Sequence, residues 1–126
     1  MFTLSESQRS WLTLKLNRAE ALFADQLQRI NGSTDNPGET ANRLVWHVAA
    51  LAEADLLRRN LRQLIYLADA PDSAVTLEIL VERYTEEILR STPERSTNPV
   101  SNLVSELKRE AHQETLQTLV ALRDRS

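Results

Sequence analysis

Residues 44–52, with the sequence LVWHVAALA, form the most apolar stretch of this chain. Wound as a helix, the stretch is apolar around nearly its whole circumference, whereas a surface helix carries a single apolar stripe. A helix of this kind in a soluble protein has to be covered on several sides, either by the rest of its own domain or by a partner chain. The sequence therefore predicts a helix that lies at the centre of an assembly of helices.

Helix breakers are rare in the chain, which has two glycines and four prolines. Nearly all of them lie where a helix should begin or end. Asn31 and Gly32 end a first segment of helical periodicity, and Asn36 and Pro37 begin the next. No alternating strand pattern competes with these segments. We expect helices over residues 4–30, 37–70, 73–90 and 99–123.

Local signals at helix starts support this division. Thr3 followed by Glu6 has the spacing of a capping box for the first helix. Asn98 and Pro99 repeat the start signal of the second helix at the start of the fourth. Four helices joined by short loops favour an antiparallel bundle, and 126 residues suffice for one domain with its own core.

The unequal helix lengths point to a partner chain. A helix over 37–70 would be about 50 Å long, against about 27 Å for a helix over 73–90, so a self-contained bundle leaves part of the long helix uncovered unless it kinks. We therefore expect an all-α antiparallel bundle of about four helices with one long central helix, which associates into an oligomer. The alternative is a broad core face within one chain.

The second helix carries two apolar stripes. One runs along its whole length and is the expected core stripe, formed by Trp46, Ala50, Ala54, Leu57, Leu61, Leu64 and Ala68. The other lasts about two turns and is the expected interface. Off-stripe residues of the fourth helix extend this prediction, so that the interface residues are Leu44, Val45, Val48, Leu51, Leu116, Leu119 and Val120.

The second stripe becomes polar further along the same helix, where it continues as Asp55, Arg58, Arg59, Arg62 and Tyr66. Guanidinium groups and a phenol could contact a nucleic-acid backbone and stack on a base. The same group could pair with acidic residues of a partner chain. It could also be a solvated helix face in which Asp55 pairs locally with the neighbouring arginines.

The third helix carries the opposite charge, with Glu78, Glu82 and Glu86 four residues apart. In a dimer this line could face the arginine stripe and determine the orientation of the two chains. A site for magnesium or manganese is an alternative. A third possibility is a solvated face, and we assign no metal and no cofactor to the chain.

The two histidines differ in their surroundings. His47 lies in the apolar stretch, where we expect a core or interface imidazole bonded to one partner. The alternative is a pH-sensitive association switch, which requires His47 to lie at a seam between chains. His112 stands beside Glu110 and Glu114, and we expect it to be solvated on the polar side of its helix.

Catalytic motifs are not evident. The chain has no cysteine, no Glu-x-x-His or His-Glu-x-x-His pattern and no glycine-rich phosphate loop. Its formal net charge of −3 argues against coating nucleic acid through bulk positive charge. No apolar segment approaches the ~20 residues that span a bilayer, and without a signal for secretion we expect a cytoplasmic protein.

The function that these features favour is that of a non-catalytic helical interaction subunit or adaptor, acting by self-association or by docking into a larger assembly. The first alternative is a small helical nucleic-acid-binding subunit of a ribonucleoprotein that uses the arginine stripe. The second is an enzyme with a carboxylate-bound metal in the bundle.

Overall fold

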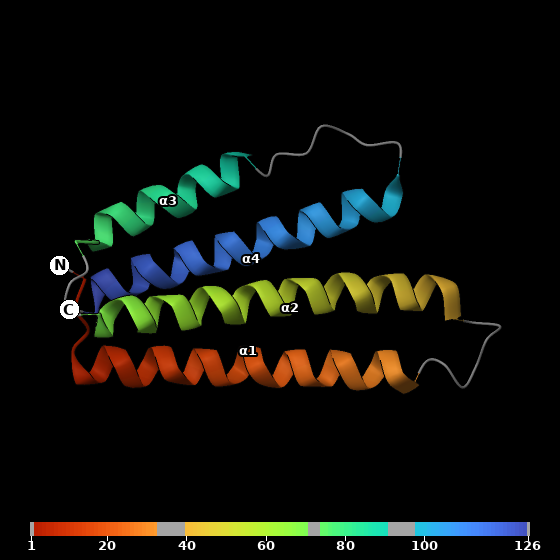
Figure 1. Cartoon of the computed structure of the whole chain (residues 1–126), viewed down its shortest axis with the longest axis horizontal. Coiled ribbons are helices and arrows are strands. Elements are labelled where there is room, and N and C mark those ends of the chain that lie inside the picture. Colours follow the sequence, from red (N-terminus) through yellow and green to blue (C-terminus); the bar gives the residue numbers. More distant parts are fainter. Residues whose placement is uncertain (1, 33–39, 71–73, 91–97, 126) are drawn as a thin grey trace.

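The computed structural model describes residues 2–32, 40–70, 74–90 and 98–125. This part of the chain contains no strand and has four helices, α1 (Glu6–Gly32), α2 (Thr40–Asp69), α3 (Leu77–Arg90) and α4 (Pro99–Asp124), shown in Figure 1. The all-α prediction is confirmed. The third helix begins four residues later than expected, and the predicted start of the second, at Asn36 and Pro37, lies outside the described residues.

The first helix begins with a capping box two residues beyond the predicted one. The Ser5 hydroxyl accepts a hydrogen bond from the backbone amide of Gln8 at 3.1 Å. The side-chain oxygen Oε1 of Gln8 accepts one from the backbone amide of Ser5 at 2.8 Å. These reciprocal bonds satisfy amide groups that the first helical turn leaves unpaired. The predicted box at Thr3 and Glu6 is therefore wrong: α1 begins at Glu6, and the preceding segment bonds through the Phe2 amide to the Val75 carbonyl.

Side chains also cap the later helices. The Thr76 hydroxyl accepts a hydrogen bond from the Ile79 amide at 3.2 Å at the start of α3. The Asn98 side-chain oxygen accepts one from the Ser101 amide at 3.5 Å at the start of α4, where the sequence predicts the cap.

The helices lie side by side in the order α3, α4, α2, α1 (Figure 1). Extensive packing joins α1 to α2, α2 to α4 and α4 to α3. Neighbours run antiparallel in the α1–α2 and α3–α4 pairs, but α2 and α4 run in the same direction. The bundle is thus not uniformly antiparallel. The reason is that α4 packs against α2 as well as against α3, and α2 and α4 run in the same direction.

This order removes one argument for a covering chain. The neighbours of α2, which has 30 residues, are α1 with 27 and α4 with 26. Both are nearly as long as α2, so the shortness of α3 does not leave α2 overhanging.

Among the described residues, none of the helices combines the length and the apolar character that a membrane span requires.

The core is concentrated towards the end of the bundle where α1 begins and α4 ends. The buried cluster there draws on all four helices and the N-terminal segment, and comprises Phe2, Leu12, Ala19, Leu57, Leu61, Leu64, Leu80, Ala111, Leu119 and Leu122. Towards the opposite end the helices diverge (Figure 1). The predicted core stripe of α2 is accordingly buried from Ala54 to Leu64 at Ala54, Leu57, Leu61 and Leu64, but Trp46 is 60% exposed. Trp46 lies near the start of α2, at the end of the bundle where the helices diverge.

Candidate interaction surface

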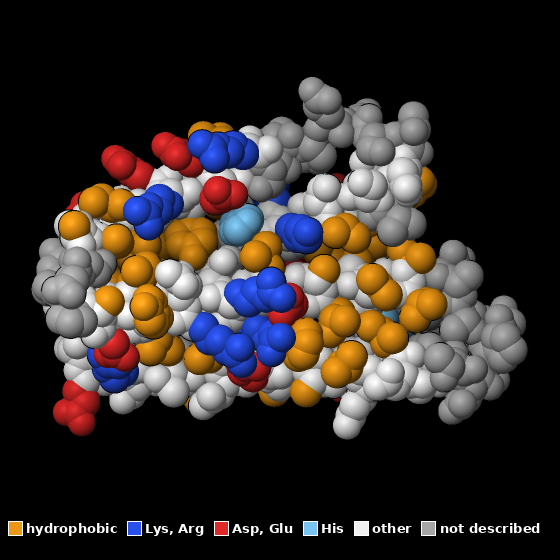
Figure 2. All heavy atoms as spheres, in the orientation of Figure 1, with side chains coloured by type: hydrophobic (Ala, Val, Ile, Leu, Met, Phe, Trp, Pro, Cys, Tyr) orange, Lys and Arg blue, Asp and Glu red, His pale blue; other side chains and the backbone are white. Residues whose placement is uncertain are grey.

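The second stripe of α2 points away from the core, and we call it the outer face of α2. Its apolar half includes Val48, which is 45% exposed, and the half-buried Leu44 and Leu51. Figure 2 shows this side of the molecule, with apolar side chains gathered over the diverging ends of the helices and a cluster of cationic side chains in the middle. The predicted juxtaposition of an apolar patch and a basic patch is therefore present on one surface.

Helix α1 contributes to the same surface. Glu20 contacts Arg58, and Gln26 Oε1 lies 3.2 Å from His47 Nδ1, so the two helices pair with rising numbers on α1 against falling numbers on α2. This register places Leu27, which is 42% exposed, at the level of Val48. The exposed apolar patch therefore spans two helices.

Arg58 is held by its own chain. Its Nε donates to Asp55 Oδ1 at 2.9 Å and its Nη1 donates to Glu20 Oε2 at 3.2 Å. The guanidinium carbon lies 3.6 Å from the centroid of the Phe23 ring, within the range of a cation–π contact. Its side chain is only 19% exposed. Arg58 thus joins α1 to α2 and is poorly placed to bind a ligand.

The two remaining arginines of the stripe project further. Arg59 pairs with Asp55 at 3.0 Å and Arg62 pairs with Glu20, while their side chains are 69% and 54% exposed. Tyr66 is exposed one turn further along. Three guanidinium groups share two carboxylates, so the cluster keeps a net charge of about +1, which is modest for backbone binding to nucleic acid.

The predicted interface residues of α4 do not form an exposed patch. Leu116 and Val120 are half-buried, as is Val45 in α2, whereas Leu119 is completely buried. Leu119 therefore belongs to the core and not to an interface. The sequence interpretation missed this because the same face carries Thr115 and Thr118, which appear polar in sequence.

Both threonines are buried without an unsatisfied hydroxyl. Thr115 Oγ1 donates to the Ala111 carbonyl and Thr118 Oγ1 donates to the Glu114 carbonyl, each at 2.8 Å. A threonine that bonds its own helix in this way can be buried at little cost. The core face of α4 consequently includes Thr115 and Thr118 together with Leu119 and Leu122.

The acidic line of α3 does not meet the arginine stripe within the chain. Glu78, Glu82 and Glu86 are exposed, and α3 has no extensive contact with α2. In the part of the chain that the structure describes, no group of three or more carboxylate, imidazole or thiol side chains is arranged to hold a metal ion.

Sequence reasoning also missed a groove between α2 and α3 with His112 of α4 in its lining. Asn60 Nδ2 donates to Thr115 Oγ1 at 3.1 Å and lies 3.3 Å from His112 Nδ1. Because an amide nitrogen can only donate, His112 Nδ1 is the acceptor in this contact. His112 is half-buried, and not solvated as predicted, because Asn60 and Tyr84 enclose it. Burial lowers the pKa of His112, and it raises the pKa of the Tyr84 phenol.

The side of the bundle opposite the outer face of α2 has a hollow, which we call the acidic hollow. It is lined by Lys15, Glu53, Glu110, Gln113, Glu114, Gln117 and Ala121. Burial raises the pKa of Glu53, and repulsion from Glu110 and Glu114 raises it further. Three carboxylates therefore share this hollow with one ammonium group.

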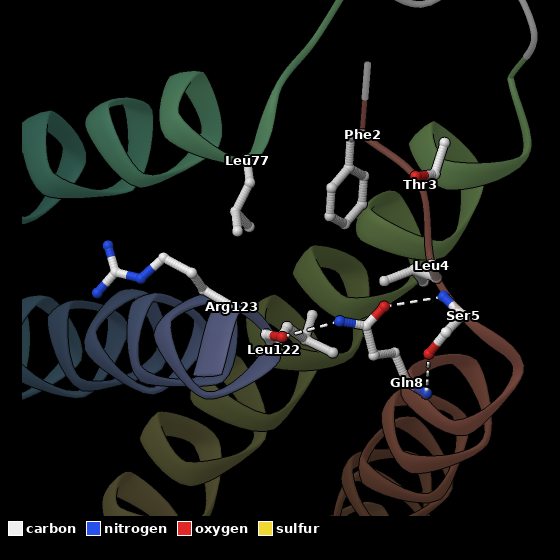
Figure 3. A pocket seen from close by; sticks show the side chains of 8 residues that line it. All are labelled: Phe2, Thr3, Leu4, Ser5, Gln8, Leu77, Leu122 and Arg123. Carbon is white, nitrogen blue, oxygen red and sulfur yellow. Dashed lines mark hydrogen bonds between the residues drawn. The ribbon is translucent and has the colours of Figure 1, made fainter. Parts of the chain in front are cut away.

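The N-terminal segment closes the end of the bundle (Figure 3). The Phe2 amide donates to the Val75 carbonyl at 2.6 Å, and the Phe2 ring is buried. Gln8 Nε2 donates to the Leu122 carbonyl at 2.9 Å, which ties α1 to α4. Figure 3 shows a pocket beside this segment, bounded by Phe2, Leu77, Leu122 and Arg123. These contacts indicate a structural role for residues 2–5, which hold the start of α3 against the other helices.

Comparison with known protein families, with curated proteins and with solved structures gave no match to this chain.

Proposed function

We propose that this protein is a non-catalytic helical interaction subunit that self-associates through the outer face of α2 and the adjoining edge of α1. The observation that carries the proposal is that the described part of the chain covers the most apolar stretch of the sequence incompletely. Val48 and Leu27 remain exposed on either side of the α1–α2 seam. Contiguous exposed apolar surface of this kind marks protein contacts. A location in the cytoplasm is part of this proposal.

Light scattering coupled to size-exclusion chromatography tests the proposal. The chain has a mass of 14.3 kDa, and we expect a larger particle whose mass falls on dilution. Val48→Lys and Leu27→Lys should each weaken association by about tenfold or more, because each buries a charge at the contact.

Leu14→Lys is the matched control, since Leu14 is an exposed leucine of α1 on a different side of that helix from Leu27. It should leave the particle mass unchanged. A wild-type mass of 14.3 kDa at every concentration contradicts the proposal, as does equal weakening by all three variants.

Binding of nucleic acid is the second candidate, supported by the exposure of Arg59, Arg62 and Tyr66 along one stripe. Its test is fluorescence anisotropy of a labelled single-stranded RNA at low and moderate salt. Binding that weakens with salt and is lost in Arg59→Ser/Arg62→Ser supports this function. An unchanged anisotropy at low salt argues against it.

A further inference from the structure

Two opposite sides of α2 each carry a charged area bordered by apolar side chains, and the two charged areas have opposite sign. On the outer side, Arg59 and Arg62 form what we call the basic ridge. Glu53 lies nine residues before Arg62, which is about two and a half turns, so the two side chains point in opposite directions. The basic ridge and the acidic hollow therefore lie on opposite faces of the bundle.

The acidic hollow has more carboxylates than cations in its lining. Glu53, Glu110 and Glu114 form no ion pair with any described residue, and Lys15 is the cation among the lining side chains. Mutual repulsion in a partly buried hollow is unfavourable unless a positive group approaches from outside. The mismatch in charge is thus a feature that a basic partner would relieve.

Exposed and half-buried apolar side chains border each charged area. The outer apolar patch consists of Leu27, Val48 and Leu51. The rear apolar patch consists of Leu22 and Trp46, both more than half exposed. Leu22 follows Lys15 by seven residues and Trp46 precedes Glu53 by seven, so each shares a helix face with a residue that lines the hollow.

The spacing along α2 is similar on the two sides. Leu51 and Arg59 are eight residues apart, about 12 Å, and Trp46 and Glu53 are seven apart, about 10 Å, at 1.5 Å per residue. Two copies with parallel α2 helices, displaced by about one and a half turns, would bring Arg59 of one copy to the level of Glu53 of the next, and Leu51 to the level of Trp46.

We propose that copies of this chain associate face to back, with the basic ridge and outer apolar patch of one copy seated on the acidic hollow and rear apolar patch of the next. This inference rests on the proposed self-association and specifies its geometry. Such an interface is heterologous, so it builds a ring where the rotation closes and an extended assembly where it does not. Exposed ion pairs contribute to it, so the assembly dissociates as salt rises.

Charge reversal on each face tests the arrangement. The front variant is Arg59→Glu/Arg62→Glu and the back variant is Glu110→Arg/Glu114→Arg; all four positions are exposed, so the fold tolerates the changes. Glu78→Arg/Glu82→Arg on the exposed edge of α3 is the matched control for added positive charge. Particle mass is measured by light scattering, and helicity by circular dichroism shows that each variant is folded.

Face-to-back association predicts that the front and back variants are each monomeric, that the control assembles like the wild type, and that an equimolar mixture of front and back variants assembles again. The mixture regains assembly because each reversed face meets a reversed partner.

Two other results overturn the inference in different ways. A back variant that still dimerises while the front variant does not shows a symmetric contact between two outer faces, which leaves the proposed function intact. A wild-type protein that is monomeric at every concentration removes both the geometry and the proposed self-association.

Discussion

Asn60 of α2 and Thr115 of α4 are joined by a buried hydrogen bond of 3.1 Å, which places a polar bridge in the packing of two parallel helices. The same amide group also reaches His112. Asn60, Thr115 and His112 therefore form one network, in which Asn60 Nδ2 donates to Thr115 and contacts His112 while Thr115 donates to the Ala111 carbonyl. Buried networks of this kind select one register between helices.

Replacing Asn60 tests the value of this bridge. Asn60→Ala should lower the free energy of unfolding by about 1–3 kcal/mol, because it leaves buried acceptors without their donor. Gln63→Ala, at an exposed position of the same helix, should change it by less than about 0.5 kcal/mol. Urea denaturation followed by circular dichroism measures both. Equal effects would show that the bridge has no energetic role.

The His112 network predicts a dependence of stability on pH. Burial holds the pKa of His112 below its ordinary 6.5, so the unfolded chain takes up a proton at higher pH than the folded chain. The stability that His112 contributes is therefore complete above pH 6.5 and declines as the pH falls from there through the lower folded pKa. Lys108 acts in the same direction and Glu87 in the opposite one.

The measurement is the imidazole proton shift of His112 by NMR, assigned by its loss in His112→Gln. Denaturation of both proteins across this pH range separates the contribution of His112 to stability from that of Glu53. The pKa of Glu53 is raised in the folded protein, so its contribution to stability falls as the pH rises. A titration midpoint of His112 at or above 6.5 would refute the network as described.

Two neighbouring arginines should differ in their importance to the fold. Arg58→Ala should destabilise the protein by about 1–2 kcal/mol, because the side chain bridges Asp55 and Glu20 and covers the Phe23 ring. Arg59→Ala, which removes an exposed guanidinium with one ion pair, should cost at most about 0.5 kcal/mol. Thermal unfolding of the two variants at equal protein concentration is the test. A larger loss for Arg59 would contradict the assignment of Arg58 as the structural member of the stripe.

The N-terminal segment should hold α3 in place. Phe2→Ala removes a buried ring and should cost about 3–5 kcal/mol, with the increased amide exchange concentrated in α3. Thr3→Ala, at an exposed position of the same segment, serves as the control and should leave exchange unchanged. Exchange that rises evenly over all four helices in Phe2→Ala would show that the segment does not act on α3 in particular.

The sequence predicts which parts of the chain are helical because capping and periodicity are local. Asn98 is the cap that its side chain and the following proline indicate. The first helix shows the limit of this method: Thr3 and Ser5 both begin a pattern that resembles a capping box, and the local sequence does not choose between them. In the structure Ser5 is the cap, while Phe2 is buried and bonds to Val75, far along the chain.

Burial on individual helix faces is less predictable. Thr115 and Thr118 bond their own helix and become core residues, which brings Leu119 into the core with them. Trp46 shows the reverse case, since the largest apolar side chain of the α2 stripe lies exposed where neighbouring helices diverge. Neither outcome follows from hydrophobicity at a single position.

By itself, the sequence determined four helices and the adjacency of apolar and basic groups on the stripe within residues 44–62, since 3.6 residues per turn place them on one side of any helix. Only the tertiary structure decided that α4 lies between α2 and α3, that Arg58 is paired with Glu20, and that the basic ridge and the acidic hollow face opposite ways. Those features depend on which helix faces pack together, and that choice is made by contacts between residues distant in the chain.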